Sequence, residues 1–240
     1  MTTFTPSTLS RELIDYINDP QLYHTQYNQY TNNKLTPISN NQIKHIKLIT
    51  LGNSNTGKSC IIKRYCERKF HDTYICTIGI DYGIKHIVVD TVLHNIINNQ
   101  SDDNGIINSN QYVQCKLNFF DLAGSIEYSS IRYEFIQNSD IILLVYDIMN
   151  KQSYYDIGAW LDEYKQYNNK TNIDQPSQIY VVCNKIDLLQ PQTDHISIDE
   201  VQAYCNQHNC IYMETSAATG HNIELLFNTV ISNWSKLHHN

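Results

Sequence analysis

The stretch that decides the fold is Gly52-Asn53-Ser54-Asn55-Thr56-Gly57-Lys58-Ser59. It has the pattern G-x-x-x-x-G-K-S, which is the phosphate-binding P-loop. An apolar run of strand length, residues 46–51, precedes it, and residues 60–65 continue it as a predicted helix. Because Gly52 and Gly57 lack a Cβ, the backbone can turn tightly around an anion. Successive N–H groups and the positive end of the helix dipole then favour a phosphate.

Two side chains of this loop complete the chemistry. Lys58 can neutralise charge on the β- and γ-phosphates of a nucleotide, and the Ser59 hydroxyl can ligate a Mg²⁺ that bridges them. An eight-residue pattern can arise by chance in a Gly-containing loop. Here the strand before it and the helix after it supply the context that the motif requires.

Length, charge and cysteine usage narrow the class of protein. The chain has 240 residues, enough for one sizeable α/β domain with extensions. Its net charge of −7 argues against broad nucleic-acid binding. Seven cysteines without a C-x-x-C pair indicate reduced, intracellular thiols. The sequence has no signal pattern and no apolar run long enough to cross a bilayer, so we expect a cytoplasmic protein, with nuclear entry left open. Because no cysteine stands at the C-terminus, we expect that the chain is not prenylated and has no lipid anchor of its own. We also expect a monomer.

The order of elements predicts the fold class. Residues 1–44 are polar and predict a flexible N-terminal extension, the alternative being a segment that folds back onto the domain. Strands are predicted over 45–51, 80–93, 112–120, 141–147, 179–183 and 211–214, with helices to about 68 and over 153–168, 199–208 and 222–237. Residues 94–111, six of them Asn, predict an insertion in a hairpin. We expect an α/β P-loop NTPase domain over 45–237, with a mostly parallel six-stranded sheet, one antiparallel edge strand and helices on both faces.

Four further short motifs follow the P-loop in the order expected of one family. They are Thr77-Ile78-Gly79-Ile80-Asp81-Tyr82, Asp121-Leu122-Ala123-Gly124, Asn184-Lys185-Ile186-Asp187 and Thr215-Ser216-Ala217. Each is weak alone, but together the five resemble the Ras-like small GTPases, Rab branch, over residues 46–236. Residues 59–67 and 79–83 look closest to Rab-like GTPases that carry a J-domain. This chain has no His-Pro-Asp tripeptide, which marks a J-domain, so we expect it to lack the J-domain half.

The resemblance implies a phosphate and metal site. By resemblance, the Thr77 hydroxyl ligates Mg²⁺ while its N–H meets the γ-phosphate, so this loop, switch I, orders with GTP and relaxes after hydrolysis. Asp121 holds Mg²⁺ through water, and Gly124 in switch II offers an N–H to the γ-phosphate. The P-loop residues expected to bind the nucleotide run from Gly52 to Cys60. Phe70 falls where the family places an aromatic ring against guanine, although a plain hydrophobic anchor fits it as well.

The resemblance also implies a guanine site. Asp187 accepts hydrogen bonds from the guanine N1–H and 2-amino group, whereas adenine would leave this carboxylate unpaired. Asn184 braces the P-loop and contacts the base, and the Lys185 stem lies along the ring. The loop containing Ser216 and Ala217 brings the Ala217 N–H to the guanine O6. Tyr82, Phe120 and Phe135 fall where Rab proteins carry effector-facing aromatic residues, with packing at the edge of the core as the alternative.

Ser125 departs from the family and leaves the function open. The family usually has a glutamine here to orient the attacking water, and serine is too short to do the same. The leading hypothesis is a Mg²⁺-dependent GTP/GDP switch with slow hydrolysis, for which Lys58, Thr77, Gly124 and Ser125 form the catalytic set. Its partners would be effectors at switches I and II, an exchange factor and a GTPase-activating protein, in vesicle traffic or signalling. A GTP-binding scaffold with negligible turnover is the alternative, and Asp187 argues against an ATP-using enzyme.

Overall fold

The structure is a computed structural model, and it describes residues 43–90, 112–168 and 177–238. Two expectations lie outside these residues: the polar extension at the N-terminus, of which residues 1–42 are not described, and the Asn-rich insertion at 94–111. The domain boundaries therefore stay a prediction. None of the helices within the described ranges is both long enough and apolar enough to cross a membrane.

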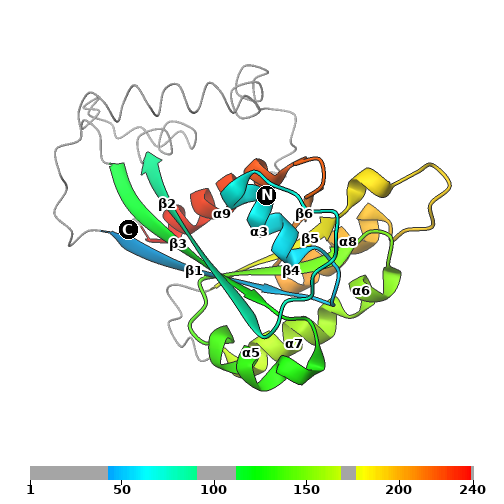
Figure 1. Ribbon diagram of the computed structural model, residues 1–240, viewed down its shortest axis with the longest axis horizontal. Coiled ribbons are helices and arrows are strands. Elements are labelled where there is room, and N and C mark those ends of the chain that lie inside the picture. Colours follow the sequence, from blue (N-terminus) through cyan, green and yellow to red (C-terminus); the bar gives the residue numbers. More distant parts are fainter. Residues whose placement is uncertain (1–42, 91–111, 169–176, 239–240) are drawn as a thin grey trace, which may run out of the picture. The chain divides into compact units, whose positions relative to one another are not determined.

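Within these described ranges, six strands form one sheet with the order β2-β3-β1-β4-β5-β6 (Figure 1). Their bounds are Lys44–Leu51 for β1, Ile80–Asp90 for β2, Tyr112–Leu122 for β3, Ile141–Asp147 for β4, Gln178–Asn184 for β5 and Ile211–Glu214 for β6. Strand β2 pairs antiparallel with β3, from Ile80 opposite Leu122 to Asp90 opposite Tyr112, and every other pairing is parallel. The predicted fold class, with one antiparallel edge strand, is confirmed.

Helices cover both faces of the sheet, because its central strands are apolar on both sides. All seven residues of β4 are buried. On one face lie α3 (Lys58–Glu67) and α9 (Ile223–His238), and on the other lie α5 (Ser129–Ile136), α7 (Ile157–Tyr167) and α8 (Ile198–His208) (Figure 1). The short α6 (Lys151–Tyr155) follows β4. The result is a three-layer arrangement with one core on each side of the sheet.

Some elements differ from the sequence prediction. The helix expected over 153–168 is two helices, α6 and α7, that meet at Asp156, and helix α5 was not predicted at all. The residues that α5 buries are Arg132 and Ile136, so a charged side chain occupies the inward face where the helical pattern requires an apolar one. Two 3₁₀ turns, η3 (Ile126–Tyr128) and η4 (Ile186–Leu188), were also missed.

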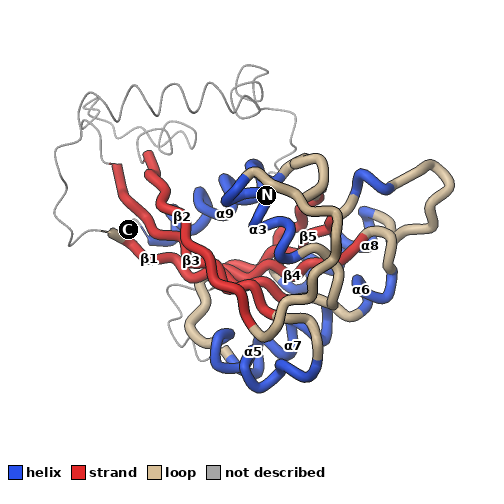
Figure 2. The backbone as a smooth tube through the Cα atoms, viewed as in Figure 1, coloured by secondary structure: helices blue, strands red, loops and turns tan. Residues whose placement is uncertain are grey.

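The loops that carry the short motifs meet at one edge of the sheet. Strands β1, β3 and β5 run parallel, so the segments that follow them leave at the same, carboxyl edge. The loop between α3 and β2 ends at Ile80, which pairs with Leu122 at the carboxyl end of β3 (Figure 2). In open α/β sheets, ligands bind at this edge.

Candidate nucleotide-binding site

The P-loop has a backbone that other residues could not adopt at its two glycines. Gly52 has φ 141° and Gly57 has φ 92°, both in the region that favours glycine. A Cβ on Gly52 would lie 2.2 Å from the Val145 carbonyl oxygen, and one on Gly57 would lie 2.2 Å from the Asn184 Nδ2. The sequence pattern therefore corresponds to a physical requirement, which is close approach of the loop to β4 and β5.

Lys58 lies at the mouth of this loop as a buried ammonium group. Its Nζ donates to the carbonyl oxygens of Gly52 and Asn53, at 2.8 Å each. Burial lowers the pKa of Lys58 to about 8, while the nearby Asp121 carboxylate acts in the opposite direction. A desolvated cation held by neutral carbonyls fits an anion such as a phosphate, because an anionic partner would favour its charged form.

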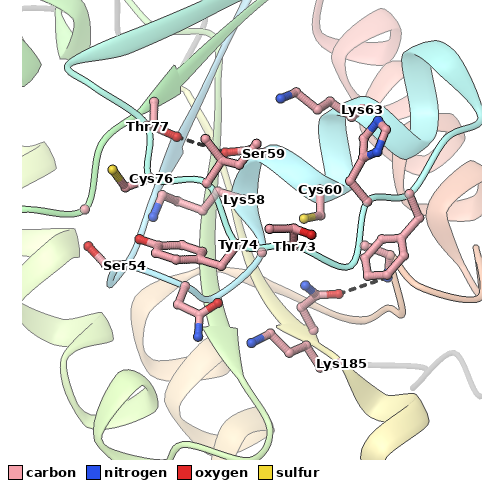
Figure 3. A pocket seen from close by; sticks show the side chains of 18 of the residues that line it. Ser54, Lys58, Ser59, Cys60, Lys63, Thr73, Tyr74, Cys76, Thr77 and Lys185 are labelled. Carbon is pink, nitrogen blue, oxygen red and sulfur yellow. Dashed lines mark hydrogen bonds between the residues drawn. The ribbon is translucent and has the colours of Figure 1, made fainter.

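Hydroxyl and carboxylate oxygens gather beside the lysine. Ser59 Oγ lies 3.0 Å from Thr77 Oγ1 (Figure 3). Thr77 Oγ1 in turn lies 3.3 Å from Asp121 Oδ2. Ser59 also donates to Asp121, and Thr50 donates to the other carboxylate oxygen at 2.8 Å. Burial raises the pKa of Asp121, and these hydrogen bonds act in the opposite direction. Oxygen donors of this kind fit Mg²⁺, so Ser59, Thr77 and Asp121 are the residues that would hold it.

A cavity of about 530 Å³ joins the motifs, and side chains reach it from separate segments. Figure 3 shows Lys58 and Ser59 from α3, Thr77 from the segment before β2, and Lys185 from the end of β5. Fourteen of the residues expected from the sequence line it: Ser54, Asn55, Gly57, Lys58, Ser59, Cys60, Phe70, Thr77, Gly124, Ser125, Asn184, Lys185, Asp187 and Ala217. A nucleotide is of the size that pockets of this volume hold.

Five expected residues are not among those that line the cavity. They are Gly52, Asn53, Thr56, Asp121 and Ser216. Both polar atoms of the Asn53 side chain already have partners in the protein. Its Nδ2 donates to Asp156, just before α7, at 2.6 Å, and its Oδ1 accepts from Trp160 of α7 at 2.7 Å. Asn53 can therefore contribute to ligand binding only through its main chain.

Asn184 connects three of the motif loops. Its Nδ2 donates to the Thr56 carbonyl oxygen at 2.9 Å, and its Oδ1 accepts from Thr215 Oγ1 and from the Ala217 N–H at 3.2 Å each. These hydrogen bonds join Asn184 to the P-loop, as the bracing role expected of this residue requires. The Ala217 N–H, expected to meet guanine, already has this partner in the protein and would have to share or exchange it.

Two residues that the sequence analysis missed, Asp147 and Arg64, contact residues that line the cavity. Lys185 forms an ion pair with Asp147 at 2.7 Å, which aligns its stem along the cavity. Arg64 places its guanidinium 5.7 Å from the Phe70 ring centre and donates to the Ala217 carbonyl oxygen at 2.7 Å. Arg64 lies inside a predicted helix, and nothing in a local pattern marks it.

The aromatic residues expected to face effectors do lie together. The Tyr82 and Phe120 rings are 5.0 Å apart, and Phe120 and Phe135 are 5.5 Å apart. Tyr82 is half exposed, whereas Phe120 of β3 and Phe135 of α5 are partly buried and pack against the core on the α7 side of the sheet. The residues from 71 to 76 also line the cavity, a contribution that their irregular sequence did not indicate.

A P-loop, a cavity of about 530 Å³ beside it and a mostly parallel sheet with one antiparallel edge strand define a nucleotide-binding α/β domain of the small GTPase type. The sequence model of the Ras family matches residues 47–236, and the chain belongs to this family. It is 39% identical over 194 residues to DnaJ homolog subfamily C member 27 of Gallus gallus, covering 78% of this chain and 60% of that protein. The human protein of the same name is 38% identical over 191 residues, covering 77% and 59%.

These matches confirm the resemblance to Ras-like small GTPases that the short motifs indicated. The relatives also carry the DnaJ name, in agreement with the resemblance to J-domain-carrying Rab-like proteins. The chain spans about three fifths of the length of these relatives.

Proposed function

We propose that this chain is a guanine-nucleotide switch that binds GTP or GDP with Mg²⁺ and hydrolyses GTP slowly. The observation that carries the proposal is one cavity with a phosphate cradle at one end and Asp187 beside Ala217 at the other. The free thiols of all seven cysteines fit the reducing setting of the cytoplasm or nucleus.

At the phosphate end, the P-loop amides and Lys58 would bind the β- and γ-phosphates, while Ser59, Thr77 and Asp121 would hold the metal. A bound Mg²⁺ would neutralise charge that develops on the phosphate oxygens. Thr77 can report on the nucleotide, because it lies in the loop that lines the cavity and leads into β2. Switch I and the segment after Gly124 would then form a surface whose shape depends on the bound nucleotide. Effectors, an exchange factor or an activating protein would bind this surface, in vesicle traffic or signalling.

At the base end, Asp187 would select guanine. Ser216 donates to its Oδ1 at 2.5 Å, and this fixes the carboxylate while leaving Oδ2 as a further acceptor. Guanine offers two N–H donors on one edge, whereas adenine would leave the acceptor unpaired. An unsatisfied polar group costs about 1–3 kcal/mol, and more when it is charged.

The test is magnesium-dependent binding of labelled GDP and GTP by the full chain, with excess ATP as competitor. We expect micromolar or tighter binding that ATP does not displace, and loss of binding in Lys58→Ala. Asp187→Asn should relax the preference for guanine, whereas Asp162→Asn, the same change on the exposed side of α7, should not. A wild-type chain without magnesium-dependent uptake, or Asp187→Asn with full guanine selectivity, would overturn the assignment.

A GTP-binding interaction module with negligible turnover is the second candidate, and Ser125 favours it. Ser125 lines the cavity, and its side chain is shorter than the glutamine that would orient an attacking water. Single-turnover hydrolysis of bound GTP, with and without cell extract, separates the two candidates. Triphosphate that persists for days in both conditions supports the module, and hydrolysis within hours supports the switch.

A further inference from the structure

Arg132 of α5 is the largest fully buried side chain in the described part of the chain, with 1% of it exposed. A charge removed from water must be paired and hydrogen-bonded. Glu163 of α7 supplies the pair, because Arg132 Nε lies 2.8 Å from Oε1 and Nη2 lies 3.2 Å from Oε2. The Trp160 ring adds a face 4.9 Å from the guanidinium carbon. Helix α7 thus holds the arginine through both an acidic and an aromatic side chain.

The remaining nitrogen of Arg132 holds main chain that belongs to the cavity. Nη1 donates to the carbonyl oxygens of Ala123, at 2.9 Å, and Ser125, at 2.6 Å. These two carbonyls flank Gly124, the residue expected to offer its N–H to the γ-phosphate. Gly124 lies hard against the P-loop, since a Cβ there would be 2.5 Å from the Gly52 carbonyl oxygen. Arg132 therefore holds the Ala123–Gly124 peptide unit and the Ser125–Ile126 peptide unit, which bracket a glycine with no room for a side chain.

The same helix also holds the P-loop itself. Trp160 donates to Asn53 Oδ1, and Asp156, at the start of α7, accepts from Asn53 Nδ2. Five residues, Asn53, Arg132, Asp156, Trp160 and Glu163, therefore form a connected set that we term the α7 clamp. Both backbone segments that would face the γ-phosphate are positioned by this one helix.

We propose that Arg132 is a positioning residue that lets the site distinguish a nucleoside triphosphate from a diphosphate. This inference rests on the proposed function. A diphosphate contacts the Lys58 cradle alone, whereas a triphosphate also contacts the segment around Gly124. When the α7 clamp holds that segment in place, the triphosphate does not have to order it on binding. Without the clamp, that ordering cost falls on the triphosphate and not on the diphosphate.

The experiment compares the affinities of a fluorescent GDP and a non-hydrolysable GTP analogue, with Mg²⁺, for the full chain. Arg132→Lys keeps the charge but cannot reach the carboxylate and both carbonyls at once. It should lower the affinity for the GTP analogue about tenfold, while the affinity for GDP stays within about threefold of the wild-type value. Trp160→Phe keeps the ring and removes the donor to Asn53, and it should shift the ratio in the same direction by about threefold. Glu134→Gln, exposed on the same helix α5, should change neither affinity.

Each other outcome overturns a defined statement. If Arg132→Lys weakens both nucleotides equally and Trp160→Phe leaves the ratio unchanged, Arg132 only stabilises the core and the inference is wrong. If Arg132→Lys does not fold, the ratio in Trp160→Phe decides alone, and an unchanged ratio overturns the inference. A wild-type chain that binds neither nucleotide overturns the proposed function, and the inference with it.

Discussion

Thr50 shows how a single buried hydroxyl prepares the metal site. It is the one polar residue in the buried run 48–51 at the end of strand β1, and it is fully buried. Its donation to Asp121 Oδ1 leaves Oδ2 for Ser59 and Thr77. Because one oxygen of the carboxylate is already bonded, the other is directed at the hydroxyl groups beside the cavity.

We predict that Thr50→Val weakens magnesium-dependent binding without affecting the rest of the nucleotide site. Valine has nearly the same shape, and a lost hydrogen bond to a charged group costs about 1.5–3 kcal/mol. The ratio of GDP affinity in Mg²⁺ to GDP affinity in EDTA should therefore fall about tenfold, with the affinity in EDTA unchanged. Thr229→Val on α9 is the matched control. An unchanged ratio would show that Thr50 does not orient Asp121.

A second residue-scale prediction concerns Ser125. Ser125→Gln should raise the intrinsic rate of GTP hydrolysis about tenfold or more, because positioning of the attacking water is worth at least that factor. Single-turnover measurement of the nucleotide bound to purified protein tests this. Ser130→Gln, exposed on α5, is the control. An equal rate in wild type and Ser125→Gln would mean that another group orients the water.

At this scale the sequence predicted most of the cavity wall and little of what lies behind it. The P-loop and the Asn184-Lys185-Ile186-Asp187 stretch are local patterns, so spacing alone identifies them. Trp160 and Asn53 are 107 positions apart, and Arg132 and Glu163 are 31 apart. Contacts of this kind depend on how α5 and α7 pack, and no local pattern of apolar residues encodes that.

At the scale of elements, α9 is joined to α3 and β3 through three aromatic rings. Tyr65 and Phe227 are stacked with ring centres 3.9 Å apart, and Phe119 meets Phe227 edge-on at 5.7 Å. Phe119 and Phe227 are fully buried, and Tyr65 is nearly so. Helix α3, which follows the P-loop, therefore packs against α9, the last described helix of the chain.

We predict that Phe227→Ala lowers the free energy of unfolding by about 3–5 kcal/mol, as expected for a buried phenylalanine. Leu237→Ala, on the same helix but 38% exposed, should cost less than about 1 kcal/mol. Chemical denaturation of both variants measures the difference. A Phe227→Ala chain as stable as Leu237→Ala would mean that α9 does not support the core in this way.

The predicted elements were correct wherever the pattern is purely apolar, as in β4 and β5. They failed where polar side chains make the contacts. Asp156 ends α6 and begins α7, and it also accepts from Asn53, so the continuous helix expected over 153–168 is divided at a residue that holds the P-loop. Helix α5 escaped prediction because Arg132 occupies its inward face.

At the scale of the whole molecule, the described residues of the site all lie in the part of the chain from residue 43 onward. Residues 43–240 form one compact unit by their contacts, and β1 begins at Lys44. Among the described residues, the hydrogen bonds that hold the cavity and the α7 clamp join residues of this unit. The function proposed here should therefore be a property of that unit.

We predict that a fragment beginning at Ile43 binds GDP with an affinity within about twofold of the full chain. Residues 1–42 are rich in Asn, Gln, Thr and Tyr, a composition that offers little apolar surface for a shared core. Titration of fluorescent GDP against both proteins measures this, and a chain with residues 1–42 in scrambled order separates the effect of their sequence from that of their length. If the fragment and the scrambled chain both bind tenfold more weakly, the N-terminal sequence contributes to the nucleotide site. If the fragment alone weakens, the contribution is one of bulk, and the unit is not self-sufficient.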